Sequence, residues 1–219
     1  MVNEIIAVVL GYLLGSIPTA YIATRVAMGK DVRQLGGGNV GGLNVYREVG
    51  VKAAMVVGIV DVGKGAAAVA IALWLLKVEV PFVLLAGFAS VVGHNWMVFL
   101  KFSGGKGMGA TFGALAVLLP AYGYWQGLVI LFGIILVPFI ITRNVALSMG
   151  IGLVSLPFIV WLGMQTGPSV PSVFPFVIWS VAVGVIIAIK FIPTAREAWV
   201  RNKTKKGFIF DDGREDKRH

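Results

Sequence analysis

The sequence predicts an all-α polytopic integral membrane protein, a bundle of about seven transmembrane helices. Of its 219 residues 58% are hydrophobic and 13% are charged, whereas soluble domains have roughly 45–50% and about 25%. Mean hydropathy is +0.88, and the apolar residues form long runs bounded by Gly, Pro or charge. This composition excludes a soluble globular domain and a disordered chain. Because cysteine is absent, disulfide scaffolds, thiolate catalysis and cysteine-ligated metals are excluded as well.

Seven stretches are candidate spans, since a helix needs about 20 apolar residues to cross a bilayer. They are 4–24, 53–76, 80–100, 107–120, 122–141, 145–165 and 173–192. The first lacks a basic segment before it, so we expect a span and not a cleavable signal. The fourth is short and ends at Pro120, so we expect it to tilt little or to lie half-buried beside a cavity. The connections are short, so we expect one transmembrane bundle over 1–192 and a basic cytoplasmic tail over 193–219.

The lysines and arginines predict the orientation, because cytoplasmic loops carry an excess of both. If the N-terminus is outside, every lysine and arginine falls in an inner segment except Lys64, which lies in a span, and Lys77. We therefore expect an outside N-terminus and a cytoplasmic C-terminus. The net charge of +9 then reflects this orientation and a tail on anionic headgroups, and we expect no nucleic acid as a partner.

The first inner segment is unusually rich in glycine. Five of its seven residues 36–42 are glycine, at positions 36, 37, 38, 41 and 42. Without a Cβ, successive backbone N–H groups can turn toward one concavity and hold an anion. The planar guanidinium of Arg47 suits phosphate. The segment predicts a phosphate-binding cradle, with a flexible or tightly turning membrane loop as the alternative. Its candidate binding residues are Gly37, Gly38, Asn39, Gly41, Gly42 and Asn44.

A second glycine cluster opens the fourth predicted helix on the same face. Gly104, Gly105 and Gly107 surround Lys106, and the backbone donors and dipole of a helix N-terminus favour an anion there. The spacing does not match a Walker A motif, so a nucleotide is not indicated. Two such cradles on one face predict two phosphate-bearing ligands that meet at the membrane.

His94, Asp61 and Lys64 are ionisable residues inside predicted spans, where such groups are functional candidates by default. His94 is near the inner end of the third span, and it either takes part in the site or anchors the following loop. Asp61 and Lys64 are three residues apart on one helix face, which favours a structural ion pair. The spacing of Gly11 and Gly15 permits close helix packing without any further role.

Four elements together resemble one family. They are Gly15-Ser16-Ile17-Pro18, the loop from Gly36 to Arg47, Asp61-x-x-Lys64-Gly65, and the segment from Gly93-His94 to Lys106-Gly107. Their order and spacing are similar to those of the PlsY-type acyl-phosphate:glycerol-3-phosphate acyltransferases. The resemblance covers about residues 11–113 and extends weakly to 192.

The resemblance implies a seven-helix enzyme of a prokaryotic cell (inner) membrane, with its site facing the cytoplasm. Such enzymes transfer a fatty acyl group from acyl phosphate to the sn-1 hydroxyl of glycerol 3-phosphate, giving lysophosphatidic acid and phosphate, the first step of phospholipid synthesis. Acyl phosphate, glycerol 3-phosphate and membrane lipids are the implied partners, with no coenzyme A, cofactor or metal. Residue by residue, Arg47 and Lys106 would neutralise substrate phosphates, and His94 would support or orient the site. The hydroxyl proton would pass to His94 or to a substrate phosphate.

The chain also departs from the family pattern. Gly37 stands where the family has serine, Gly42-Leu43 where an Ala-Thr pair is usual, and Ala146 where a serine follows the fifth span. The family's C-terminal His, Asn and Glu have no clear counterpart after Lys190. Each missing donor would cost on the order of 1–3 kcal/mol of phosphate or transition-state binding. The alternative function is therefore a degenerate paralogue that binds phosphorylated lipid or acyl phosphate without turnover. A small transporter is disfavoured, because the predicted outer loops hold few polar residues.

Overall fold

The computed structural model describes residues 1–164 and 172–201, and within them every regular element is a helix. The α-helices are α1 (Val2–Gly15), α2 (Thr19–Met28), α3 (Gly42–Glu48), α4 (Val51–Ala70), α5 (Val80–Asn95), α6 (Met108–Ala121), α7 (Gln126–Thr142), α8 (Val145–Met164) and α9 (Phe174–Arg201). Short turns of other helix types are η1 (Val32–Gln34), η2 (Ile71–Leu75) and η3 (Val98–Leu100). The prediction of an all-helical protein is confirmed for these residues.

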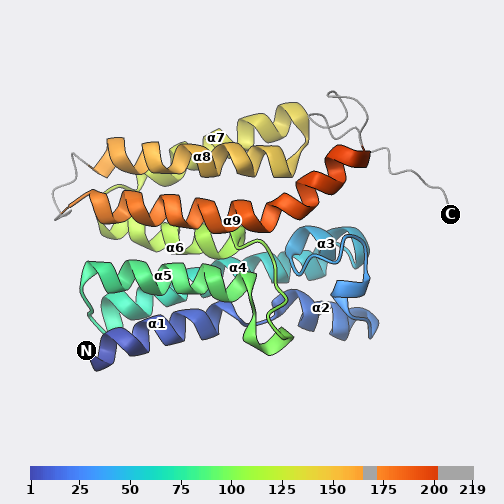
Figure 1. Ribbon diagram of the computed structural model, residues 1–219, viewed down its shortest axis with the longest axis horizontal. Helices are drawn as coiled ribbons and strands as arrows, with labels where there is room; N and C mark the ends of the chain where they lie inside the picture. Colours follow the sequence, from blue (N-terminus) through green and yellow to red (C-terminus); the bar gives the residue numbers. More distant parts are fainter. Residues whose placement is uncertain (165–171, 202–219) are drawn as a thin grey trace.

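The helices form a bundle in which the long axes run roughly side by side (Figure 1). Helix α1 packs against α5 and α4, α4 packs against α6, and α8 packs against both α7 and α9. The N-terminus lies at one end of the bundle, and the last turn of α9 lies at the other (Figure 1). Helices α2 and α3 extend this second end beyond α5.

The structure has a helix in each of the seven predicted stretches. Four segments are long and apolar enough to cross a membrane: Val2–Met28, Val51–Leu75, Val80–Leu100 and Phe174–Pro193. Three shorter apolar helices cover Met108–Ala121, Gln126–Thr142 and Leu147–Gly163. A multi-span membrane protein is therefore confirmed, while the number of spans stays a prediction. The division at residue 192 also stays a prediction, since α9 continues to Arg201 and residues 202–219 lie outside the described part.

The first predicted span is broken into α1 and α2 at Ser16–Pro18. Proline has no backbone N–H and cannot continue a helical ladder, and Pro18 lies just before Thr19, the first residue of α2. The sequence predicted a continuous helix here. The break allows α2 to leave the axis of α1 and to carry the glycine-rich segment beside α4, against which α2 packs.

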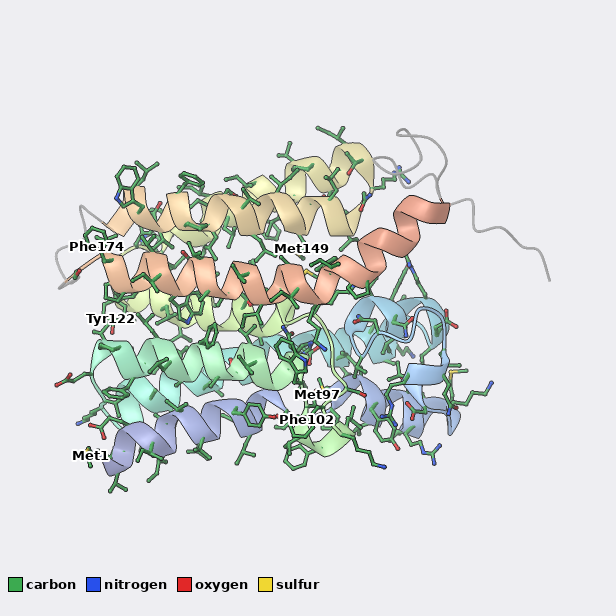
Figure 2. The ribbon with its side chains drawn as sticks, viewed as in Figure 1. Met1, Met97, Phe102, Tyr122, Met149 and Phe174 are labelled. Carbon is green, nitrogen blue, oxygen red and sulfur yellow. The ribbon has the colours of Figure 1, made fainter. Side chains whose placement is uncertain are left out.

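The outer surface of the helices is apolar, as contact with lipid requires. Ile59 is 73% exposed, Val154 71% and Ile178 66%, and Figure 2 shows many side chains projecting outward along the helices. A soluble protein rarely exposes a contiguous apolar surface of such extent. This surface agrees with the membrane location that the composition predicts.

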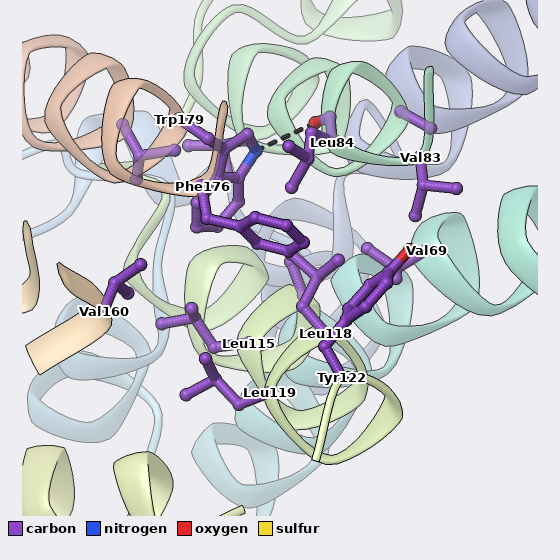
Figure 3. Close-up of a cluster of buried hydrophobic side chains, with 14 of the residues drawn as sticks. Val69, Val83, Leu84, Leu115, Leu118, Leu119, Tyr122, Val160, Phe176 and Trp179 are labelled. Carbon is purple, nitrogen blue, oxygen red and sulfur yellow. Dashed lines mark hydrogen bonds between the residues drawn. The ribbon is translucent and has the colours of Figure 1, made fainter. Parts of the chain in front are cut away.

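The main core lies between α5, α6 and α9 (Figure 3). The rings of Tyr122 and Phe176 meet edge to face with centroids 4.9 Å apart. The indole Nε1–H of Trp179 donates to the carbonyl oxygen of Leu84 at 2.8 Å. The indole hydrogen bond joins α9 to α5 and the aromatic pair joins α9 to the end of α6, and both favour one packing arrangement.

Glycine allows α1 and α5 to approach closely. A Cβ on Gly11 would meet the carbonyl oxygen of Ala86, and one on Gly15 would meet that of Ser90. Without large side chains, backbones in a membrane can pack by van der Waals contact. The close packing predicted from the spacing of Gly11 and Gly15 is confirmed.

Candidate active site

The two glycine clusters lie against each other, and Gly105 is at their contact. The N–H of Gly105 donates to the carbonyl oxygen of His94 at 2.9 Å. A Cβ on Gly105 would lie against His94 Nε2 and 2.6 Å from the carbonyl oxygen of Val40, within the first cluster. The structure therefore brings the two predicted cradles and His94 together. Their roles toward ligands stay predictions.

The first cluster forms a short loop between η1 and α3. Its end is fixed by Asn44, whose buried amide Nδ2 donates to the carbonyl oxygens of Val32 at 3.3 Å and of Leu35 at 3.0 Å. The side chain of Asn44 thus shapes the loop from inside and does not present its amide donors to a ligand. Gly37, Gly38 and Asn39 lie on the accessible side of the loop, where a Cβ on Gly37 would meet nothing within 4 Å.

The remaining residues of the first cradle lie at the start of α3. Gly41 is buried next to Asn39, and Gly42 is the first residue of α3. Arg47 is exposed in the last turn of this helix. Its side chain is therefore on the same short helix that the loop enters, and accessible to an anion outside the bundle.

The second cluster leads directly into α6. Gly107 caps the N-terminus of α6 with a φ of +77°, a conformation that only glycine adopts readily. A Cβ on Gly104 would meet the carbonyl oxygens of His94 and Asn95, so this loop lies directly on the end of α5. Lys106 is half-buried between these glycines, and its ammonium lies 4.2 Å above the ring centroid of Phe191 in α9.

A buried polar cluster supports this loop from below. Lys64 Nζ lies 2.9 Å from Asp61 Oδ1 and donates to the carbonyl oxygen of Ile17 at 3.2 Å. The ion pair predicted from the spacing is confirmed. His94 Nδ1 is 3.7 Å from Asp61 Oδ1 and has no hydrogen-bond partner among the described residues. His94 thus faces the ion pair with one ring nitrogen and Gly105 with the other.

Sequence reasoning did not single out Asn95, Lys190 or Phe191. Asn95 is fully buried, and neither of its amide atoms has a hydrogen-bond partner in the described part of the chain. Its Oδ1 lies 2.7 Å from where a Cβ of Gly107 would be. Lys190 Nζ lies 4.8 Å above the ring of Trp96. An amide next to a glycine-rich loop was the available signal for Asn95, but nothing in the sequence pairs α9 with that loop.

Asp31 and Arg33 form an ion pair outside the spans, beside the first cradle. Arg33 NH2 lies 2.6 Å from Asp31 Oδ2, and this hydrogen bond holds the pKa of Asp31 below its ordinary value. The Arg33 guanidinium also lies 5.8 Å from the ring centroid of Tyr21. The pair thus stays ionised to lower pH than a free aspartate would.

The residues that depart from the family pattern differ in how exposed they are. Gly37 has open space around it, so a serine would fit without any rearrangement. Leu43 is 42% exposed in α3. The Ala146 side chain and the side chains that follow Pro193 lie outside the described part.

Comparisons with known proteins agree on one family. The family model for glycerol-3-phosphate acyltransferase matches residues 5–199. Glycerol-3-phosphate acyltransferase 1 of Dehalococcoides mccartyi is 47% identical over 205 residues, which cover 94% of this chain and 95% of the relative. Glycerol-3-phosphate acyltransferase 2 of Moorella thermoacetica is 39% identical over 156 residues, covering 71% of this chain and 77% of the relative.

A solved structure has the same fold. The crystal structure of PlsY, an integral membrane glycerol 3-phosphate acyltransferase, in its glycerol 3-phosphate form matches with a TM-score of 0.76 and 26% identity, covering 90% of this chain and 92% of that one. The lysophosphatidic acid form matches with a TM-score of 0.74 and 24% identity, covering 94% and 97%. On the sequence matches over nearly its whole length, and with this fold, the chain belongs to the glycerol-3-phosphate acyltransferase family.

Proposed function

We propose that this protein transfers a fatty acyl group from acyl phosphate to the sn-1 hydroxyl of glycerol 3-phosphate, giving lysophosphatidic acid and phosphate without coenzyme A. The observation that carries the proposal is the contact between the two glycine loops at Gly105. The backbones of both loops and Lys106 lie in one region as a result. The curated relatives are glycerol-3-phosphate acyltransferases, and PlsY was solved in glycerol 3-phosphate and lysophosphatidic acid forms.

Two small apolar hollows next to the second loop mark the side of the bundle on which we place the acyl chain. They lie between α6, α7 and α8 and share Ile135 and Met149 as lining residues. Met108 and Thr111, in the first turn of α6, line the end of one hollow that follows Gly107. Each methylene transferred from water to such an environment contributes about 0.8 kcal/mol. One acyl phosphate would thus bind with its phosphate at the Gly107 end and its acyl chain on the side of these hollows.

The chemistry needs no protein nucleophile, because acyl phosphate is already activated. The acceptor oxygen attacks the acyl carbon, the new ester bond forms, and the bond from this carbon to the phosphate oxygen breaks. Lys106 and Arg47 neutralise phosphate charge, and backbone N–H groups stabilise the oxyanion that develops. The acceptor proton passes to the departing phosphate. His94 is 3% exposed and lies behind Gly105, so it positions the loop instead of taking this proton.

We place the site on the cytoplasmic face of the cell membrane, in a seven-span protein with an outside N-terminus. The N-terminus and the last turn of α9 lie at opposite ends of the bundle, as an odd number of spans requires (Figure 1). Helices α2 and α3, with the basic residues Arg25 and Arg47, extend the end opposite to the N-terminus. Cytoplasmic segments carry this excess of basic residues.

The test is an assay of the purified protein with palmitoyl phosphate and glycerol 3-phosphate, with lysophosphatidic acid and phosphate both measured. We expect turnover in the wild type and a loss of about 10²-fold or more in Lys106→Ala and Arg47→Ala, as for loss of one transition-state donor. Lys77→Ala, in the connection between α4 and α5, is the matched charge control and should keep full turnover. If both site variants kept wild-type rates, the site assignment would be wrong.

The second candidate is the degenerate paralogue, which the open position at Gly37 favours, since a hydroxyl donor is missing there. It predicts that acyl phosphate binds without turnover. Gly37→Ser separates the two functions, because a serine fits this position without rearrangement. An inactive wild type that also stays inactive as Gly37→Ser would support the binding protein.

A further inference from the structure

Two neighbouring residues of α9 contact the loop that carries Lys106, and each contact joins a cation to an aromatic ring. The Lys106 ammonium lies 4.2 Å above the ring of Phe191. The Lys190 ammonium lies 4.8 Å above the ring of Trp96, at the start of the same loop. Loop and helix thus each supply one cation and one ring. We call the pair of contacts the reciprocal clamp.

Both distances are within the range in which a ring face attracts a cation, about 6 Å from the centroid. Such contacts gain strength where water is excluded, and Lys106, Lys190 and Phe191 are all half-buried. A lysine side chain has four rotatable carbons and considerable rotamer entropy. A ring beneath its ammonium restricts that freedom without neutralising the charge.

Phe191 is itself held firmly. Its side chain packs on the main hydrophobic core, and α9 is fixed to α5 by the hydrogen bond from Trp179 to Leu84. The ring therefore belongs to a helix that is packed on the bundle core, outside the loop. Rigid support is what holds a charged group in a productive geometry.

We propose that Phe191 is a positioning residue of the active site, which holds the Lys106 ammonium at the mouth of the second glycine loop while Lys190 on Trp96 fixes the loop's other end. The functional part of this inference rests on the proposed acyl transfer. Phe191 touches no substrate and acts through Lys106. The α9 helix is then part of the phosphate-binding machinery.

The first test compares three variants by their kcat/KM for lysophosphatidic acid formation. Phe191→Leu keeps apolar bulk but removes the ring, and we expect kcat/KM to fall about tenfold. Phe191→Tyr keeps the ring and should remain within about twofold of the wild type. Phe176→Leu makes the same change elsewhere on α9, far from Lys106, and should lower stability without lowering kcat/KM of the folded enzyme. Equal kcat/KM in Phe191→Leu and wild type, or an equal loss in Phe191→Tyr, would overturn the proposal.

The second test does not need catalysis. A double-mutant cycle combines Phe191→Leu with Lys106→Met, and the thermal unfolding midpoint in detergent is measured for all four proteins. If the ring acts through the ammonium, the effect of Phe191→Leu becomes smaller in the Lys106→Met background, and what remains is the loss of core packing. Strictly additive shifts would show that Phe191 only packs, which refutes the clamp. If the unfolding midpoints showed a clear coupling but the wild type had no turnover, the proposed function would be refuted and the contact between Phe191 and Lys106 would stand.

Discussion

Gly105→Ala changes a residue at which the two glycine loops meet. The added Cβ would lie 2.6 Å from the carbonyl oxygen of Val40 and against His94 Nε2. Real Cβ contacts need at least 3.0 Å, so the Val40 carbonyl must retreat by about 0.4 Å and the nearer His94 ring by more. Neither neighbour can rotate away easily, because one is backbone and the other is a buried ring. Overpacking of this kind costs roughly 1–3 kcal/mol of stability.

The retreat also displaces Lys106, the next residue, relative to the first loop. A misplacement of about 1 Å costs on the order of 10²-fold in rate, so we expect Gly105→Ala to lower kcat/KM by between about tenfold and about 10²-fold. The assay is lysophosphatidic acid formation, with thermal unfolding measured in parallel. Gly63→Ala is the matched control, because a Cβ there meets nothing within 4 Å on α4. It should keep full activity and gain about 0.5–1 kcal/mol of stability. Wild-type kcat/KM in Gly105→Ala would refute contact between the loops.

Three further predictions concern stability. Asp61→Ala leaves the buried ammonium of Lys64 unpaired, so the free energy of unfolding should fall by about 3–5 kcal/mol, whereas Asp61→Leu combined with Lys64→Met should recover much of the loss in chemical denaturation. Trp179→Phe removes a 2.8 Å hydrogen bond and should cost about 1 kcal/mol by the same measurement; no change would show that this bond contributes nothing. The pKa of Asp31 is lowered by Arg33, so the pair stabilises the fold above the ordinary pKa of 3.8 and loses this effect as pH falls further. Asp31→Asn should remove that pH dependence, which is under about 1 kcal/mol for a pair this exposed.

The helices follow from the sequence because their cause is local. Long apolar runs have one stable arrangement in a bilayer, the helix, which satisfies every backbone N–H and C=O internally. The close contact of α1 with α5 follows in the same way from Gly11 and Gly15. The break at Pro18 was missed, because the hydropathy of the stretch does not fall where its helical ladder stops.

The candidate site was predictable in composition but not in detail. Glycine, Arg47 and Lys106 mark both loops, and a shared membrane face predicts that the loops are near each other. The contact itself depends on backbone geometry at Gly105. Phe191 could not be found in this way, because an aromatic residue near the end of an apolar helix is ordinary until the fold places Lys106 on its ring.

The break in the first span gives a physical reason for the ion pair inside the membrane. A broken helix leaves backbone carbonyls that hydrocarbon cannot satisfy. The carbonyl oxygen of Ile17 accepts from the Thr19 N–H at 3.0 Å and, as a second partner, from Lys64 Nζ. A lysine buried there needs a counter-charge, which Asp61 supplies at 2.9 Å.

The same carboxylate faces His94, and the far side of that imidazole abuts Gly105, next to Lys106. These contacts form one chain from the broken helix to the loop that carries Lys106. A chain that needs a glycine-rich loop at the membrane surface has to leave the helix to build it. The buried polar contacts stabilise the helix break at Ser16–Pro18 and connect it to the second loop.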